Sequence, residues 1–227
     1  MRYYGVNEER IYIVPFLPPL HIISDKVNVD IKAKYSVDGQ FIYYPAQFWP
    51  HKNHVYVLNA IKILKDEGIY LNVVFSGSDK GNLNHVMSYA KTLGIEKQLK
   101  YIGFVSGEDV RALYKEALAL VMPTYFGPTN LPPLEAFALE TPVIYSDTPD
   151  FRAQIGDAGL FCDLYNVKSL VHHLKLPIYN KDLRETLASK GKLKFQQILS
   201  NKFEDTLESI FDLYSIKLST WKNIPSL

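Results

Sequence analysis

The stretch YFGPTNLPPLEAFALETPVI, residues 125–144, contains the pattern that decides the fold. Pro132 and Pro133 predict the start of a helix, because the first helical turn does not need the amide hydrogens that proline lacks. Asn130 is the expected N-cap of this helix, since short polar side chains accept hydrogen bonds from the first free amides. The run that follows Pro133 is apolar apart from one acid, Glu135.

A strand is expected on each side of this helix. The apolar run 117–121 has the length of a buried strand, and Val143-Ile144-Tyr145 follows the helix-ending Pro142. A loop that leads from a strand into a helix N-terminus is where α/β sheets bind anions, because free amides and the helix dipole point at the ligand. The alternative interpretation is a proline-rich loop that only ends a strand.

The composition excludes several classes of protein. The chain has 227 residues, of which 47% are hydrophobic and 22% charged, as in ordinary globular domains. A formal charge of +1 argues against a nucleic-acid-binding face. The single cysteine, Cys162, fits a reducing compartment. No apolar run approaches the roughly 18 residues of a membrane span, and the N-terminus lacks a signal-peptide core, so a cytoplasmic location is expected.

Strand-like and helix-like segments alternate from residue 40 onward. This alternation predicts an α/β fold with a mostly parallel, Rossmann-like sheet covered by helices on both faces. Besides the strands named above, the expected strands are 41–44, 72–75, 100–105 and 160–162, and the expected helices contain Val57–Leu64, Leu83–Leu93 and Ser106–Tyr114. The chain after Asn166 is expected to be helical, and the spacing of the last helix predicts that it buries Phe203, Leu207, Ile210, Phe211 and Tyr214.

A second candidate site is YPAQFWPHKNH, residues 44–54, which follows the first strand and begins the first helix of the sheet. Lys52 is a candidate phosphate contact, and the alternative is an ordinary solvated lysine. His51 and His54 lack an acid or cysteine at metal-ligand spacing. No D-x-D pair, P-loop, G-x-G-x-x-G or G-x-S-x-G motif is present. The residues alone therefore indicate an α/β domain that binds an anionic ligand.

Several segments together resemble a known family. FGPTNLPPLEAFALETPVIYSD is similar to the signature E-G-F-G-L-P-P-L-E-A-M-A-x-G-x-P-V-I of the retaining GT-B glycosyltransferases of family 4. YYPAQFWPHKNHVYVLNAIKIL, VVFSGSDKGN, YIGFVSGEDVRALYKEALALVMPT and IGDAGLFCD resemble further segments of that family and follow in its order. The resemblance covers residues 40 to about 175.

The resemblance implies the domain that binds the nucleotide-sugar donor. Residues 1–39 are then the remnant of an interdomain crossover, 40–200 the Rossmann-like donor domain and 201–227 a C-terminal helix and tail. The N-terminal acceptor-binding domain is expected to lie outside this chain. The implied substrate is a nucleoside-diphosphate sugar used for retaining transfer in polysaccharide or lipopolysaccharide synthesis, with no cofactor or metal and no nucleic-acid partner. The resemblance is also compatible with peripheral association of the complete enzyme with the inner face of a membrane.

The same resemblance assigns roles to individual residues. It places Lys52 on the diphosphate, Glu135 on the ribose hydroxyls and the segment Gly103, Phe104 and Val105 beside the base. It places the backbone amides around Asn130 and Leu131 near the phosphates and the sugar. It assigns no catalytic residue.

Four positions depart from the family pattern. Gly127 stands where the first glutamate of the signature contacts the transferred sugar, so sugar contacts are expected from Thr129 or Asn130. Gln47 replaces an arginine on the diphosphate side, Ala153 replaces an acid and Glu140 replaces a glycine. A catalytically silent nucleotide-binding or assembly domain is therefore the alternative function. An epimerase of the same architecture is a third interpretation, which the lack of a catalytic acid pair disfavours.

Overall fold

The computed structural model describes residues 5–7, 10–12, 14, 23, 29–127, 130–200 and 203–222. Its strands are β1 (Phe41–Pro45), β2 (Asn72–Ser76), β3 (Leu99–Tyr101), β4 (Leu120–Met122), β5 (Val143–Ser146) and β6 (Leu160–Cys162). Its α-helices are α1 (Ile31–Tyr35), α2 (His54–Asp66), α3 (Leu83–Thr92), α4 (Gly107–Glu116), α5 (Pro132–Ala138), α6 (Pro149–Ile155), α7 (Val167–Tyr179), α8 (Lys181–Ser200) and α9 (Phe203–Lys222). Two short 3-10 helices are η3 (Pro50–Lys52) and η4 (Gly156–Ala158).

The six strands form one parallel sheet in the order β3-β2-β1-β4-β5-β6. This arrangement confirms the predicted parallel α/β fold. The chain builds one half of the sheet outward from β1, then returns to the centre and builds the other half from β4. The order therefore reverses between β1 and β4, and ligands of open α/β sheets bind beyond the carboxyl ends of the strands at such a point.

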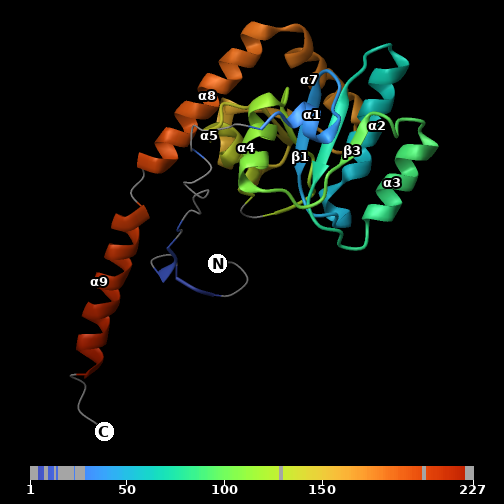
Figure 1. Cartoon of the computed structure of the whole chain (residues 1–227). Coiled ribbons are helices and arrows are strands. Elements are labelled where there is room, and N and C mark those ends of the chain that lie inside the picture. The colour runs from blue at the N-terminus through green and yellow to red at the C-terminus, as the bar shows by residue number, and fades with distance from the viewer. Residues whose placement is uncertain are drawn as a thin grey trace. The chain divides into compact units, whose positions relative to one another are not determined.

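The direction of each crossover decides which face a helix covers. Because strand connections are right-handed, the helices between β1 and β3 cover one face of the sheet. The chain then proceeds across the sheet in the opposite direction, so the helices between β3 and β6 cover the other face. Accordingly α2 contacts α3 and α7, whereas α1 contacts α4. Figure 1 shows α4 and α5 on the side of the sheet opposite α2 and α3. The first predicted helix buries the expected apolar face, Val57, Leu58, Ile61 and Leu64.

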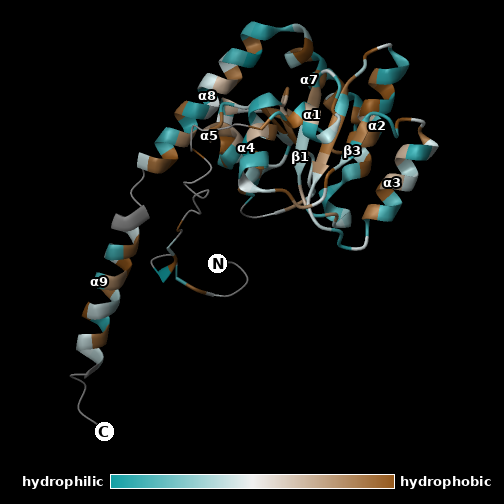
Figure 2. Cartoon of the chain, in the orientation of Figure 1, coloured by the Kyte–Doolittle hydropathy of each residue, from teal (hydrophilic) through white to brown (hydrophobic). Residues whose placement is uncertain are grey.

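The core consists mainly of the central strands and the helix faces turned toward them. Phe41, Ile42, Tyr43 and Tyr44 of β1 have no exposed surface, because a central parallel strand is covered on both faces. Each flanking helix carries both hydrophobic and hydrophilic residues, as expected for helices with one face on a sheet (Figure 2). Gly191 of α8 lies against Phe137 of α5, where an added Cβ would be 2.5 Å from the phenyl ring.

Two predicted strands were wrong in extent. The run 117–121 forms a strand only over Leu120–Met122. The strand expected over 100–105 ends at Tyr101, because Gly103 adopts φ 68 and turns the backbone away from the ladder. Its carbonyl instead accepts from the amide of Gly77 at 2.8 Å. Helix α1, which no pattern indicated, is joined to α4 by an ion pair of 2.8 Å between Lys34 and Asp109.

The predicted burial of the last helix was also wrong for its second half. Helix α9 is present, but the side chains of Phe211 and Tyr214 are 64% and 62% exposed, and Leu207 and Ile210 are half-buried. The chain separates into two compact units, residues 18–195 and residues 1–17 with 196–227. The unit that contains α9 includes none of the sheet strands described above. No described helix is both long and apolar enough to span a membrane.

Candidate functional site

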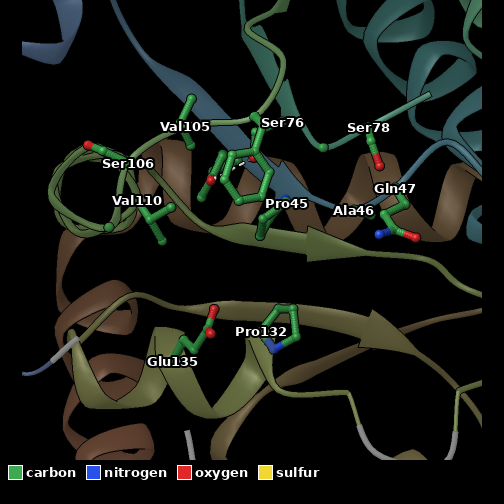
Figure 3. A pocket seen from close by; sticks show the side chains of 14 residues that line it. Pro45, Ala46, Gln47, Ser76, Ser78, Val105, Ser106, Val110, Pro132 and Glu135 are labelled. Carbon is green, nitrogen blue, oxygen red and sulfur yellow. Dashed lines mark hydrogen bonds between the residues drawn. The ribbon is translucent and has the colours of Figure 1, made fainter. Parts of the chain in front are cut away.

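A cavity of about 510 Å³ opens at the carboxyl ends of the strands beside the point where the strand order reverses. Three chain segments after β1, β2 and β3 form one side, and the start of α5 forms the other (Figure 3). Figure 3 shows Glu135 and Pro132 across the cavity from Pro45 and Val110. The lining residues are Tyr43, Pro45, Ala46, Gln47, Ser76, Gly77, Ser78, Phe104, Val105, Ser106, Gly107, Val110, Pro132 and Glu135.

A second hollow of about 390 Å³ adjoins this cavity over the loop between β4 and α5. The two share the lining residues Pro45, Ala46, Gln47 and Pro132. The second hollow adds Trp49, His51, Lys52, Met122, Asn130 and Leu131. The two stretches that the sequence singled out, 44–54 and 125–135, therefore meet at one site.

The first wall depends on a close contact between the loops after β1 and β2. Gly77 has φ 133, and an added Cβ would lie 2.5 Å from the carbonyl oxygen of Ala46. Only glycine permits that approach without moving the backbone. The segment 76–78, to which the sequence assigned no role in the site, is thus part of the cavity wall. The rule that ligands lie beyond the carboxyl ends of central strands would have included it.

Lys52 ends the short helix η3, just before α2 begins. The Tyr44 hydroxyl donates to the Lys52 carbonyl at 2.7 Å, which ties this turn to the strand β1. The ammonium donates to Oδ1 of Asn130 at 3.3 Å, and no carboxylate among the described residues lies within 4 Å of it. Burial lowers the pKa of Lys52. A half-buried cation without a carboxylate partner suits an anionic ligand.

Glu135 lies in the first turn of α5 and lines the larger cavity. The hydroxyl of the fully buried Tyr114 donates to Glu135 Oε2 at 2.9 Å, which fixes the orientation of the carboxylate. Burial and the neighbouring Glu135 charge raise the pKa of Tyr114 well above its usual range, so this hydroxyl keeps its proton. The carboxylate is therefore oriented by this hydrogen bond and directed at the cavity (Figure 3).

Asn130 does not cap α5, so that prediction was wrong. The N-cap residue is Leu131, and no side chain caps the helix. Two prolines follow Leu131, so the first amides that a cap would accept from are missing. The amide of Leu134 donates to the Leu131 carbonyl at 2.8 Å and is likewise occupied. Within the described residues, the amides of Asn130 and Leu131 have no acceptor.

The remaining predicted site residues lie around the same two hollows, except Gly103 and Thr129. Gln47 lines both, and its Oε1 accepts from the Trp49 indole at 3.0 Å. Leu131 lines the hollow near Lys52. Phe104 and Val105 line the larger cavity, and the Phe104 side chain is 92% exposed. Gly103 turns the chain into this segment. Thr129 lies outside the described residues.

Two buried groups near the site were not expected. The Tyr43 hydroxyl and Ser76 Oγ are 2.8 Å apart at the cavity floor. His54 stacks on Phe48 at 4.2 Å and on Tyr44 at 4.9 Å, with no hydrogen bond from either ring nitrogen among the described residues. Burial lowers the pKa of His54 to about 3, so this histidine is a neutral packing residue of the loop that carries Lys52.

Two departures from the family pattern have a visible structural counterpart. Gly127 has φ 150, and an added Cβ would lie 2.6 Å from Asn130 Oδ1, so a side chain at 127 would have to displace the Asn130 amide. Glu140 adopts φ 59, a left-handed conformation natural to the glycine it replaces. Its carboxylate pairs with Lys192 at 2.6 Å.

The family described as glycosyl transferases group 1 matches residues 29–194. The chain belongs to this family. The O-antigen chain mannosyltransferase B of Escherichia coli is 27% identical over 169 residues, which are 74% of this chain and 44% of that protein. The O-antigen chain mannosyltransferase RfbU of Salmonella typhimurium is 29% identical over 171 residues, 73% of this chain and 44% of that protein. The chain therefore spans less than half the length of these relatives.

Solved structures show the same fold. The C-terminal domain of the group 1 glycosyl transferase LpcC from Francisella tularensis superposes with a TM-score of 0.64 at 18% identity, covering 77% of this chain and 93% of that domain. WaaG, a glycosyltransferase of lipopolysaccharide biosynthesis, superposes with a TM-score of 0.76 at 18% identity, covering 93% of this chain and 58% of WaaG. The chain thus corresponds to the C-terminal half of the GT-B fold.

Proposed function

We propose that this domain binds a nucleoside-diphosphate sugar and serves as the donor half of a retaining glycosyltransferase. The observation that carries the proposal is the pairing of two adjoining hollows at the reversal point of the sheet, one with the half-buried cation Lys52 and one with the carboxylate Glu135. A cation suits a diphosphate, and a carboxylate suits the two hydroxyls of a ribose. Pro132 lines both hollows, so a single ligand can reach both groups.

Each described residue then has a chemical task. Lys52 stabilises the charge that develops on the leaving diphosphate, and the amides of Asn130 and Leu131 add donors that no protein group occupies in the described chain. Glu135 accepts hydrogen bonds from the ribose, and Phe104 and Val105 contact the base. Holding the donor in this geometry lowers the entropic part of the barrier to transfer.

The names of the relatives favour a particular biological setting. Two of them are O-antigen chain mannosyltransferases, so a mannosyl donor and the synthesis of a surface polysaccharide or lipopolysaccharide are the proposed substrate and pathway class. Transfer itself requires an acceptor-binding domain, since the reaction of a GT-B enzyme takes place between two domains.

Calorimetric titration with UDP-, GDP- and ADP-sugars tests the proposal. Micromolar to millimolar binding of one donor is expected, and Lys52→Met should weaken the nucleoside diphosphate more than the corresponding nucleoside, because only the diphosphate faces the lost charge. Lys97→Met is the matched control, since Lys97 is an exposed lysine before β3. Equal loss for nucleoside and diphosphate would contradict the assignment of Lys52.

A catalytically silent nucleotide-binding domain is the second candidate. Gly127 favours it, because the chain lacks an acid at that position and the Asn130 side chain occupies the adjoining space. The two functions separate in a transfer assay with an acceptor-binding half supplied on the same or another chain. Donor binding without any sugar transfer supports the silent domain.

A further inference from the structure

The Asn130 side chain is a buried amide with neighbours from four separate parts of the chain. Its Nδ2 donates to the carbonyl of Gly127 at 3.0 Å and to the hydroxyl of Tyr145, on β5, at 2.6 Å. Its Oδ1 accepts from the Lys52 ammonium at 3.3 Å. Gln154 of α6 donates from Nε2 to the backbone carbonyl of Asn130 at 2.8 Å. Only 6% of the residue is exposed, so these contacts decide its conformation.

Hydrogen-bond chemistry allows only one orientation of this amide. The Lys52 ammonium can only donate, so it must face the amide oxygen. The Gly127 carbonyl can only accept, so it must face the amide nitrogen. The two requirements are independent and agree. A flipped Asn130 would place two donors against each other and two acceptors against each other.

Tyr145 and Gln154 complete a closed ring of hydrogen bonds with Asn130, called the circuit below, in which each group donates to the next. The Tyr145 hydroxyl accepts from Asn130 and donates to Gln154 Oε1 at 3.3 Å, and Gln154 then donates back to the Asn130 carbonyl. The Tyr145 ring is fully buried and stacks on Phe151 at 4.2 Å with an interplanar angle of 13°. Burial raises the pKa of Tyr145, so its phenol keeps the proton that the circuit needs.

The hydrogen-bond partner of Lys52 is therefore the amide oxygen of Asn130. The ammonium meets a neutral oxygen, which orients it without cancelling its charge. An acid in place of this amide would neutralise Lys52 and compete with any anionic ligand. Gly127 completes the arrangement, because a side chain there would occupy the volume of the amide.

We propose that Tyr145 and Gln154 are positioning residues that act through Asn130 to hold the Lys52 ammonium, with its charge uncompensated, toward the donor diphosphate. The inference rests on the proposed function. Neither residue touches the two hollows, so their effect passes through the Asn130 amide.

Tyr145→Phe tests the circuit, because it removes one hydroxyl and keeps the stacked ring. Titration of the wild type and the variant with a nucleoside diphosphate and with its nucleoside should show a roughly three- to tenfold loss for the diphosphate and almost none for the nucleoside, as expected for one hydrogen bond. Gln154→Met breaks the circuit from α6 and should give the same split, so a folding defect in one variant does not hide the effect. Tyr89→Phe is the control, since Tyr89 donates to Asn59 at 2.8 Å outside the site.

A second measurement needs no ligand. NMR titration of protein labelled at lysine Cε reports the pKa of Lys52. His51, the neighbouring residue in the sequence, also titrates. Asn130→Asp should raise this pKa and abolish the preference for diphosphate, and Tyr145→Phe should lower it, because a freed amide no longer keeps its oxygen on the ammonium.

The outcomes separate the two proposals. If Lys52→Met weakens diphosphate binding while Tyr145→Phe and Gln154→Met change neither that binding nor the pKa of Lys52, the circuit is refuted and the proposed function stands. If the wild type binds no nucleoside diphosphate, the proposed function fails and this inference fails with it.

Discussion

Replacing Glu135 by alanine separates a ligand contact from a structural one. If the carboxylate accepts hydrogen bonds from both ribose hydroxyls, its loss removes charge-assisted bonds that contribute about 1.5–3 kcal/mol. Donor-nucleotide affinity should then fall about ten- to a hundredfold. The structure adds a second effect, because the buried Tyr114 hydroxyl donates to this carboxylate at 2.9 Å. Without it the hydroxyl keeps only a longer contact of 3.4 Å to the Pro132 carbonyl, so the free energy of unfolding should fall by about 0.5–1.5 kcal/mol.

Tyr114→Phe provides the matched control for the stability effect. The double variant Tyr114→Phe/Glu135→Ala removes both partners of the hydrogen bond, so it should recover much of the stability lost in Glu135→Ala. It should not recover affinity, because the ribose still lacks its acceptor. Unfolding in urea measures the first quantity and calorimetric titration the second.

A 2′,3′-dideoxy nucleotide completes a double-mutant cycle. It should bind the wild type about as weakly as the normal nucleotide binds Glu135→Ala, and it should lose almost nothing further against the variant, because both changes break one interaction. Additive losses would show that Glu135 does not contact the ribose and would refute the assignment.

Three further predictions concern packing and pH. Burial lowers the pKa of His54 from its ordinary value of 6.5 to about 3 in the folded protein. Its contribution to stability is therefore complete above about pH 6.5 and is lost as the pH falls toward 3, by up to roughly 1.4 kcal/mol per pH unit. The pH slope of urea stability should therefore flatten in His54→Phe, and an unchanged slope would show that another group controls acid unfolding. Gly127→Ala should displace Asn130 and weaken diphosphate binding, and titration of Gly127→Ala/Asn130→Ala should show no additional loss over Asn130→Ala alone. Gly191→Ala should lower the urea midpoint by the equivalent of about 1–3 kcal/mol through its clash with Phe137, and Phe137→Leu in the same chain should relieve part of it.

The strands of the sheet could be predicted from the sequence because they are continuous apolar runs, whereas the helices are apolar on one face only. The runs at Phe41, Asn72 and Val143 each became a parallel strand within one residue of the expected limits at either end. Helix α4 begins where a helix was expected, and Ser106 caps it by accepting from the Asp109 amide at 3.1 Å. Such features depend on neighbours in the chain, so local patterns are sufficient to find them.

Features that depend on distant partners were the ones missed. The ring stack around His54 and the closure of Asn130 by Tyr145 and Gln154 join residues from different strands and helices. Asn130 looked like a helix cap because its neighbours in sequence are prolines. Its side chain is instead bound by β5 and by the turn at Lys52, which is 78 positions away.

The sequence by itself determined the family, the parallel fold and the two segments that carry Lys52 and Glu135. Apolar periodicity and proline placement act over a few residues, so they are visible in the order of the amino acids. Only the tertiary structure decided how these segments form a site. The reversal of strand order brings the ends of β1 and β4 together, and the polarity of one buried amide then determines that Lys52 faces a neutral oxygen. That choice depends on donors and acceptors that meet only after the sheet has formed.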